Sequence, residues 1–164
     1  MKKLIVNLLM FLLMGVLLTN CSQTVVSTGV SVDVPMNETL QIYEYTHIKE
    51  YSGATIDRLE LFMGNMQELN YEEIAKSEDR IYGKNFFTKM IYGSAMEVHF
   101  NTMIKFKDSS YKLIINNFRI KDVRYGTVAV ETLGKSSQKK WMNFISNQLP
   151  LVIANLEREN TDEW

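Results

Sequence analysis

The sequence predicts an α+β fold in which a single antiparallel β-sheet packs against two helices, in the chain order β-α-β-β-β-β-α. Apolar and polar side chains alternate from Met96 to Lys107, which is typical of a strand with one solvated face. Apolar residues recur at helical spacing in two segments, 55–69 and 141–156. The 164 residues are enough for one such domain, and an apolar content of 46% excludes wholesale disorder.

The first half of the predicted domain holds a strand, a helix and a polar hairpin. Aromatic and β-branched residues predict a strand over 42–48, and Thr55 is the expected N-cap of the following helix. Gly64 lies inside this helix, where we expect it to permit close packing on the sheet. Residues 71–85 are polar and predict two short strands around Glu78–Asp79. The helix is expected to bury Ile56, Leu59, Phe62, Met63, Met66 and Leu69.

The second half is expected to complete the sheet and end in a helix. The strand over 96–107 turns at Lys107–Ser110 into a return strand that begins at Tyr111. The apolar alternation then slips by one residue, which predicts a β-bulge near Asn116–Asn117. Residues 123–130 are again rich in β-formers. The second helix follows and ends near Leu156, where a charged tail begins.

An apolar segment, Phe86–Tyr92, lies between Gly83 and Gly93 and has two interpretations. It forms either a short strand or loop over the core, or an exposed patch that contacts a partner or a membrane. The residues of the candidate contact patch are Phe86, Phe87, Met90, Ile91 and Tyr92.

The N-terminus is typical of a bacterial export signal. Two lysines precede an apolar stretch, Leu4–Leu18, which spans roughly 22 Å as a helix and is therefore shorter than a bilayer core of about 30 Å. The segment Leu18–Cys21 resembles a lipobox, although Asn20 replaces the usual small residue before the cysteine. That resemblance implies cleavage before Cys21, which then carries the lipid. A plain signal peptide and an uncleaved anchor are the alternatives.

These features divide the chain into a lipoprotein signal peptide (1–20), a lipidated N-terminus and tether (21–40), an α+β domain (41–156) and a charged tail (157–164). Alternating valines at 30, 32 and 34 leave open a short strand within the tether. We expect the membrane to be reached through the N-terminal lipid. Ser22 is not an acidic retention signal, so the resemblance favours the outer membrane of a bacterial cell envelope.

Three stretches of the domain carry a resemblance to a known family. They are 53–59 at the entry to the first helix, 78–84 at the acidic turn, and 104–112 at the Lys-Asp hairpin. In order and spacing they resemble a bacterial lipoprotein family of unknown function that is described as having a TATA-binding-protein-like (TBP-like) fold. The resemblance covers about 41–156 and implies that fold. It implies no activity, and the fold name does not imply DNA binding.

The sequence predicts no catalytic, cofactor-binding or metal-binding residue. A metal site would need His47 and His99 to converge with Glu44 or Glu97, and two half-exposed strand histidines are the favoured interpretation. Acidic pairs at 72–73 and 78–79 are interpreted as a solvated face and a turn. The sequence has no G-x-S-x-G elbow, phosphate-binding loop or dinucleotide motif.

We therefore expect a non-enzymatic envelope lipoprotein that presents a sheet face or edge to an unknown ligand or envelope protein. The alternative is a structural or assembly subunit of an envelope complex, completed by the apolar segment, and a small hydrolase ranks third. Nucleic acid is not an expected partner. With 18 basic and 19 acidic residues, loss of Lys2 and Lys3 with the signal leaves a formal charge of −3.

Overall fold

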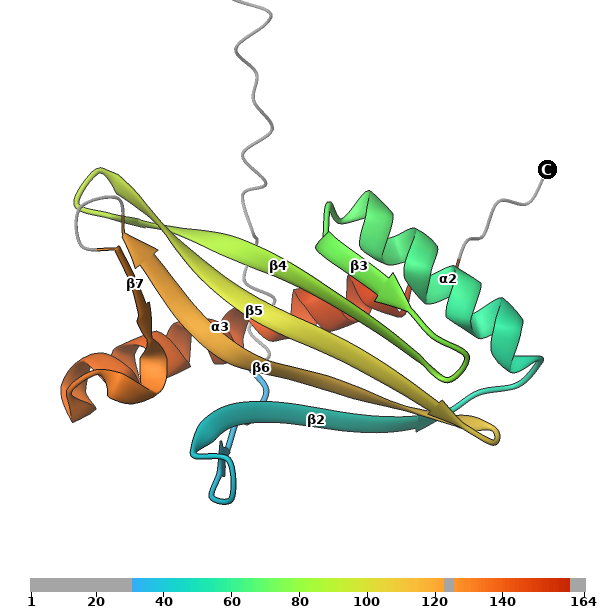
Figure 1. Ribbon diagram of the computed structural model, residues 1–164. Coiled ribbons are helices and arrows are strands. Elements are labelled where there is room, and N and C mark those ends of the chain that lie inside the picture. Colours follow the sequence, from blue (N-terminus) through green and yellow to red (C-terminus); the bar gives the residue numbers. More distant parts are fainter. Residues whose placement is uncertain (1–30, 123–125, 160–164) are drawn as a thin grey trace, which may run out of the picture.

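The computed structural model describes residues 31–122 and 126–159 (Figure 1). Within them, seven strands form one antiparallel sheet in the order β1-β2-β6-β5-β4-β3, and β7 pairs with β6. The predicted signal peptide and Cys21 lie outside the described residues. The strands are β1 (Met36–Asn37), β2 (Ile42–Glu50), β3 (Glu72–Lys76), β4 (Arg80–Ile91), β5 (Ser94–Lys107), β6 (Ser110–Asp122) and β7 (Gly126–Ala129).

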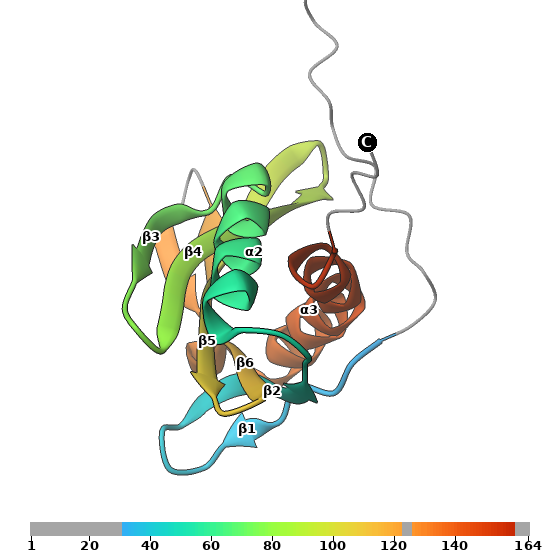
Figure 2. The same cartoon turned by 90° about the vertical axis from the view of Figure 1, so that its right-hand side faces the viewer.

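Two α-helices of the described chain, α2 (Thr55–Glu68) and α3 (Lys135–Leu156), pack on one face of this sheet (Figures 1 and 2). A short 3₁₀ helix, Val130–Thr132, leads into α3. The α+β prediction is confirmed, with β1 and β7 as additional short strands. No helix in the described part of the chain is both long and apolar enough to cross a membrane.

The hydrophobic core lies between the helices and the inward side chains of the long strands. On β5 every second residue from Val98 to Phe106 is buried, because successive side chains of a strand point to opposite faces. Aromatic rings fill the centre, and Phe62 of α2 lies 4.9 Å from the Tyr111 ring of β6. The largest fully buried side chains include Phe62, Phe100, Phe118, Leu59, Met66, Ile81, Ile104, Leu113, Ile115, Ile145, Leu149 and Leu156.

The predicted β-bulge is present in β6. His99 pairs with Arg119, whereas Asn101 pairs with Asn116, so β6 contains one more residue than β5 between these pairs. Asn117 has a φ of 55°, a left-handed conformation that asparagine tolerates better than most residues. The extra residue returns Phe118 to the buried face and explains the slip in the apolar alternation.

The helix α2 differs from the prediction in three details. Ala54 is the N-cap, and the Thr55 hydroxyl hydrogen-bonds with the Tyr51 hydroxyl at 2.8 Å instead of capping the helix. Ile56 is exposed rather than buried. A Cβ at Gly64 would meet nothing within 4 Å, whereas one at Gly83 would lie 2.9 Å from Tyr71 Cδ1, so Gly83 is the glycine that permits close packing.

The predicted domain bounds, 41–156, leave out residues at both ends that belong to the fold. Val34 lies in the core with 6% exposure, and the Val32 N–H donates to the Ser146 carbonyl of α3 at 3.1 Å. Residues 32–40 therefore belong to the fold rather than to a tether. At the other end, Glu157 of the predicted tail accepts hydrogen bonds from Lys49 and Tyr111, and Arg58 pairs with Glu159.

Candidate functional site

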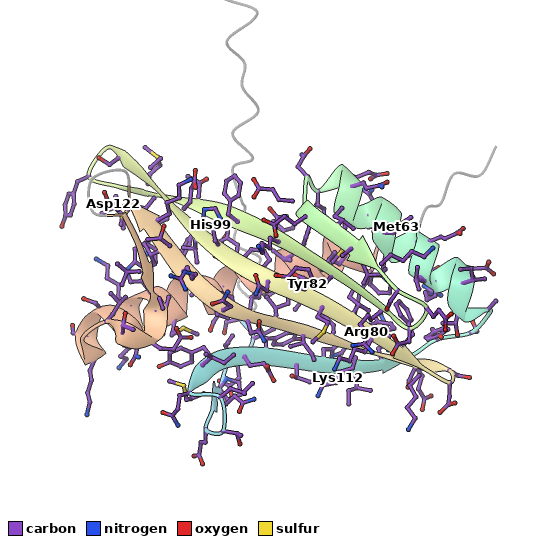
Figure 3. All side chains as sticks on the ribbon, in the orientation of Figure 1. Met63, Arg80, Tyr82, His99, Lys112 and Asp122 are labelled. Carbon is purple, nitrogen blue, oxygen red and sulfur yellow. The ribbon has the colours of Figure 1, made fainter. Side chains whose placement is uncertain are left out.

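The sheet face opposite the two helices, here called the open face, is formed by the outward side chains of β2, β4, β5 and β6. Figure 3 shows Tyr82, His99 and Lys112 along these strands. Alternation places polar and charged residues here, as expected for a strand with one solvated face. Apolar side chains are interspersed, and Ile48 is 66% exposed and Phe86 39% exposed.

A depression of about 240 Å³ lies on the open face beside the β-bulge. It is lined by residues of β4, β5, β6 and β7, and it adjoins a gap on the edge of β6 between its pairing with β2 and its pairing with β7. The last β2 pair is Glu44–Asn116 and the first β7 pair is Arg119–Ala129, so positions 117 and 118 have no strand on that side among the described residues. The residues that line this bulge depression are Lys84, His99, Phe100, Asn101, Asn117, Arg119, Lys121 and Thr127.

Glu97 organises one wall of the bulge depression. Its Oε2 accepts hydrogen bonds from Lys121 Nζ at 3.0 Å and His99 Nε2 at 2.8 Å. These bonds, with that from Lys121 the largest contribution, hold the pKa of Glu97 below its usual value. The Phe86 ring lies 5.2 Å from the His99 ring, tilted by 30°. His99 is thus fixed between a carboxylate and an aromatic ring.

Much of the hydrogen-bonding capacity of the bulge depression is unused. Lys84 pairs with Glu73, and Lys121 pairs with Glu97. Within the described residues, four other side chains of the lining make no hydrogen bond or ion pair: Asn101, Asn117, Arg119 and Thr127. The lining offers amide, guanidinium and hydroxyl donors and contains no carboxylate.

The two histidines do not converge. His47 pairs with Leu113 of the buried face, whereas His99 pairs with Arg119 of the open face. His47 Nε2 lies 3.7 Å from Glu157 Oε1, where the α3 C-terminus meets β2. Among the described residues no group of three or more His, Cys, Asp or Glu side chains is arranged to hold a metal.

The acidic pairs occupy the positions that their sequence pattern indicates. Glu73 lies at an irregularity in the β3–β4 pairing, with a φ of 53°, and pairs with Lys84. Asp79 lies in the β3–β4 turn, and its carboxylate accepts a 2.9 Å hydrogen bond from Arg80 Nε. Hydrogen bonding from Arg80 lowers the pKa of this exposed carboxyl.

The predicted contact patch is divided between the two faces of β4. Phe86, Met90 and Tyr92 are exposed, at 39%, 65% and 100%. Phe87 and Ile91 pack against the core, and the Phe87 ring lies 5.6 Å from that of Phe144. The five residues therefore do not form one continuous patch, because strand geometry alternates their directions.

Beyond Lys84, β4 is an edge strand in the described part of the sheet. The last pair between β3 and β4 is Glu72–Lys84, so residues 85–91 pair with β5 alone. The Phe86 N–H instead donates a hydrogen bond to Asn85 Oδ1 at 2.7 Å. Inward-pointing Lys89 lies 4.8 Å from the Trp141 ring and 4.4 Å from the Phe144 ring, and burial lowers its pKa.

Comparison with solved structures identifies the architecture. A TBP-like protein from Parabacteroides distasonis superposes with a TM-score of 0.52 over 77% of this chain and 99% of its own, at 13% identity. The fold is TBP-like. A DUF4468 family protein from Bacteroides ovatus matches this TBP-like domain with a TM-score of 0.50, 12% identity, and coverage of 82% of this chain and 97% of its own. No family model and no curated protein matches the sequence.

The resemblance noted from the sequence thus agrees with the observed TBP-like fold. Sequence reasoning missed the bulge depression. Its lining comes from four strands, and residues as far apart as Lys84 and Thr127 meet there. The one available signal was the phase slip at Asn116–Asn117, since bulges are over-represented next to functional sites.

Proposed function

We propose that this chain is a lipid-anchored envelope protein whose TBP-like domain is a non-enzymatic binding module, and that the open face is its binding surface. The observation that carries the proposal is the helix-free face itself. It crosses β2, β6, β5 and β4 and combines exposed apolar side chains with cations. A formal charge of −3 after signal cleavage supports a ligand other than nucleic acid.

The anchor rests on Cys21. Each buried CH₂ of an acyl chain contributes about 0.8 kcal/mol, so two or three chains give stable membrane attachment. In cells fed labelled palmitate, we expect the chain to be acylated and to fractionate with membranes. Cys21→Ser should abolish the label, and Ser22→Ala should keep it. Acylation of Cys21→Ser, or its persistence on the membrane after signal cleavage, would contradict the anchor.

The binding surface can be tested with a photocrosslinking residue in intact envelopes. One probe replaces Ile48, which is exposed on the open face, and the control replaces Asn143, which is exposed on α3. We expect a discrete crosslinked species from position 48 alone. Equal crosslinking from both positions, or from position 143 only, would rule out the open face as the binding surface.

The edge of β4 favours assembly as a second candidate function. The Arg80 carbonyl accepts a hydrogen bond from the N–H of Ser77, which follows β3, so the backbone groups of 80 point toward β3. Because these directions alternate along a strand, the backbone groups at 86, 88 and 90 point to the uncovered edge. An antiparallel pair of two copies centred on Thr88 would place Phe86 opposite Met90 on both sides. The Phe86 ring of one copy would then contact the Met90 thioether of the other.

Thr88→Pro tests this assembly without disturbing the β4–β5 ladder, because proline is tolerated where an edge N–H points away from the sheet. We expect the full chain in detergent to be dimeric by light scattering, Thr88→Pro to be monomeric, and Thr88→Val to remain dimeric. A monomeric parent protein at high micromolar concentration would remove the assembly candidate and leave the open-face proposal intact.

A further inference from the structure

The bulge depression gathers polar side chains that have no partner in the described protein. Asn101 of β5, Asn117 and Arg119 of β6, and Thr127 of β7 all line it. Such groups lie close together without hydrogen-bonding one another. Each of these side chains can donate a hydrogen bond, and none carries a negative charge, so the set is suited to a ligand that supplies acceptor oxygens.

The backbone creates this arrangement. Asn117 is in the left-handed conformation, with a φ of 55°, and adds a residue to β6. It lies between the part of β6 that pairs with β2 and the part that pairs with β7. The resulting gap leaves the edge of β6 that faces away from β5 without a strand partner at positions 117 and 118 among the described residues. A bulge commonly re-aims the side chains that flank it.

The charges of the lining are complementary to an anion. Three cations, Lys84, Arg119 and Lys121, line the depression, and no carboxylate does. The carboxylates that pair with the two lysines, Glu73 and Glu97, lie outside the lining. Arg119 has no ion pair in the described chain, and a guanidinium presents a planar fork that matches a carboxylate or phosphate.

We propose that the bulge depression binds a small organic anion through its carboxylate or phosphate group. Arg119 anchors the charged group, and Asn101, Asn117 and Thr127 hydrogen-bond the neighbouring oxygens. The inference rests on the proposed function and deepens it by naming the ligand class for the open face. The His99 ring, which lies 5.2 Å from that of Phe86, forms part of the wall next to the bound group.

Nuclear magnetic resonance of the isotope-labelled full chain in detergent tests the proposal, with inorganic phosphate, glucuronate and glucose as probes at constant ionic strength. We expect phosphate or glucuronate to shift the side-chain signals of Asn101, Asn117 and Arg119 in a saturable way. Saturation by phosphate alone indicates a phosphate ligand, and saturation by glucuronate alone indicates a carboxylate ligand. Glucose should leave these signals unshifted.

The matched variants are Arg119→Gln and Lys112→Gln, which remove the same charge from the same face, inside and outside the depression. Losing a charged hydrogen bond should raise the Kd about tenfold in Arg119→Gln, while Lys112→Gln changes it less than about twofold. Unchanged β5 and β6 amide shifts verify folding. Equal effects of both variants, non-saturating shifts at every lysine, or no shift would overturn the inference. Crosslinking from position 48 that persists in that case would preserve the proposed function.

Discussion

At the residue scale, Gly83 shows how closely the helices approach the sheet. A Cβ at this position would lie 2.9 Å from Tyr71 Cδ1 and 3.5 Å from the Met66 sulfur, and both of these residues are buried. Gly64, which lies inside α2, has open space where a Cβ would be placed. The two glycines therefore have opposite roles, which their local sequence does not distinguish.

We expect Gly83→Ala to lower the free energy of unfolding by about 1–3 kcal/mol, because the core must move to accept the methyl group. Gly64→Ala should instead raise it by about 0.5–1 kcal/mol, because alanine is favoured over glycine within a helix. Urea unfolding of both variants measures the difference. A Gly83→Ala protein as stable as the parent would show that the Tyr71 contact relaxes freely.

Tyr71 predicts how stability changes with pH. Burial raises the pKa of its hydroxyl, against the smaller opposing effects of hydrogen bonds with Thr102 and Asn85. The folded chain keeps the phenol neutral while the unfolded chain ionises it near pH 10, so this contribution is complete below pH 10 and is lost above it. Between pH 9 and 11, the parent should lose about 1 kcal/mol more than Tyr71→Phe in urea unfolding. Equal losses of stability in the parent and in Tyr71→Phe would contradict the raised pKa of Tyr71.

At the element scale, the bulge in β6 sets which side chains of this strand are buried. Before it, Leu113 and Ile115 face the helices, and after it Phe118 and Ile120 do. Because side chains alternate, removal of one residue reverses the direction of all those that follow. The bulge also places Arg119 and Lys121 on the open face rather than in the core.

Deletion of Asn117 should therefore abolish cooperative folding, since it would turn Phe118 and Ile120 to solvent and Arg119 inward. Asn117→Gly keeps the residue count and suits the positive φ, so its stability should lie within about 1 kcal/mol of the parent. Circular dichroism during thermal unfolding distinguishes the variants. A deletion variant with a parent-like transition would mean that β6 can change register.

At the scale of the whole molecule, the domain begins before its first long strand. Val34 enters the core, Val32 bonds to α3, and the Tyr43 N–H donates to Glu131 Oε1 at 2.9 Å. The segment before β2 and the start of β2 thus contact the C-terminal part of the described chain. The C-terminus is held in a similar way, because the buried Asn65 donates to the carbonyls of Leu156 and Arg158 at 2.8 Å.

A chain that begins at residue 31 should retain full stability, whereas one that begins at residue 41 should lose about 2 kcal/mol, chiefly from exposing the site that Val34 fills. Val34→Ala in the longer chain should reproduce part of this loss. Urea midpoints of the three proteins measure the effect. Matching midpoints for chains starting at 31 and 41 would return residues 31–40 to a tether.

Patterns confined to neighbouring residues could be predicted well. The alternation in β5, the turn before Ser110, the β6 bulge and the two helices all follow from local geometry. Contacts between distant residues could not be predicted. Ile56 fits the apolar stripe of its helix, yet it is exposed. The stripe predicts which side of the helix faces the sheet, but it does not predict how far the sheet extends along the helix. For the same reason, the sequence did not indicate which residues of Phe86–Tyr92 face the core and which are exposed.

The sequence by itself determined that the fold is α+β with one antiparallel sheet and two helices, because side-chain periodicity follows directly from strand and helix geometry. It also predicts lipidation at Cys21, from a pattern confined to neighbouring residues. The tertiary structure alone decided that Gly83 is the close-packed glycine, that His47 and His99 lie on opposite faces, and that four strands share the bulge depression. Each of these depends on the order of strands, which no short stretch of sequence encodes.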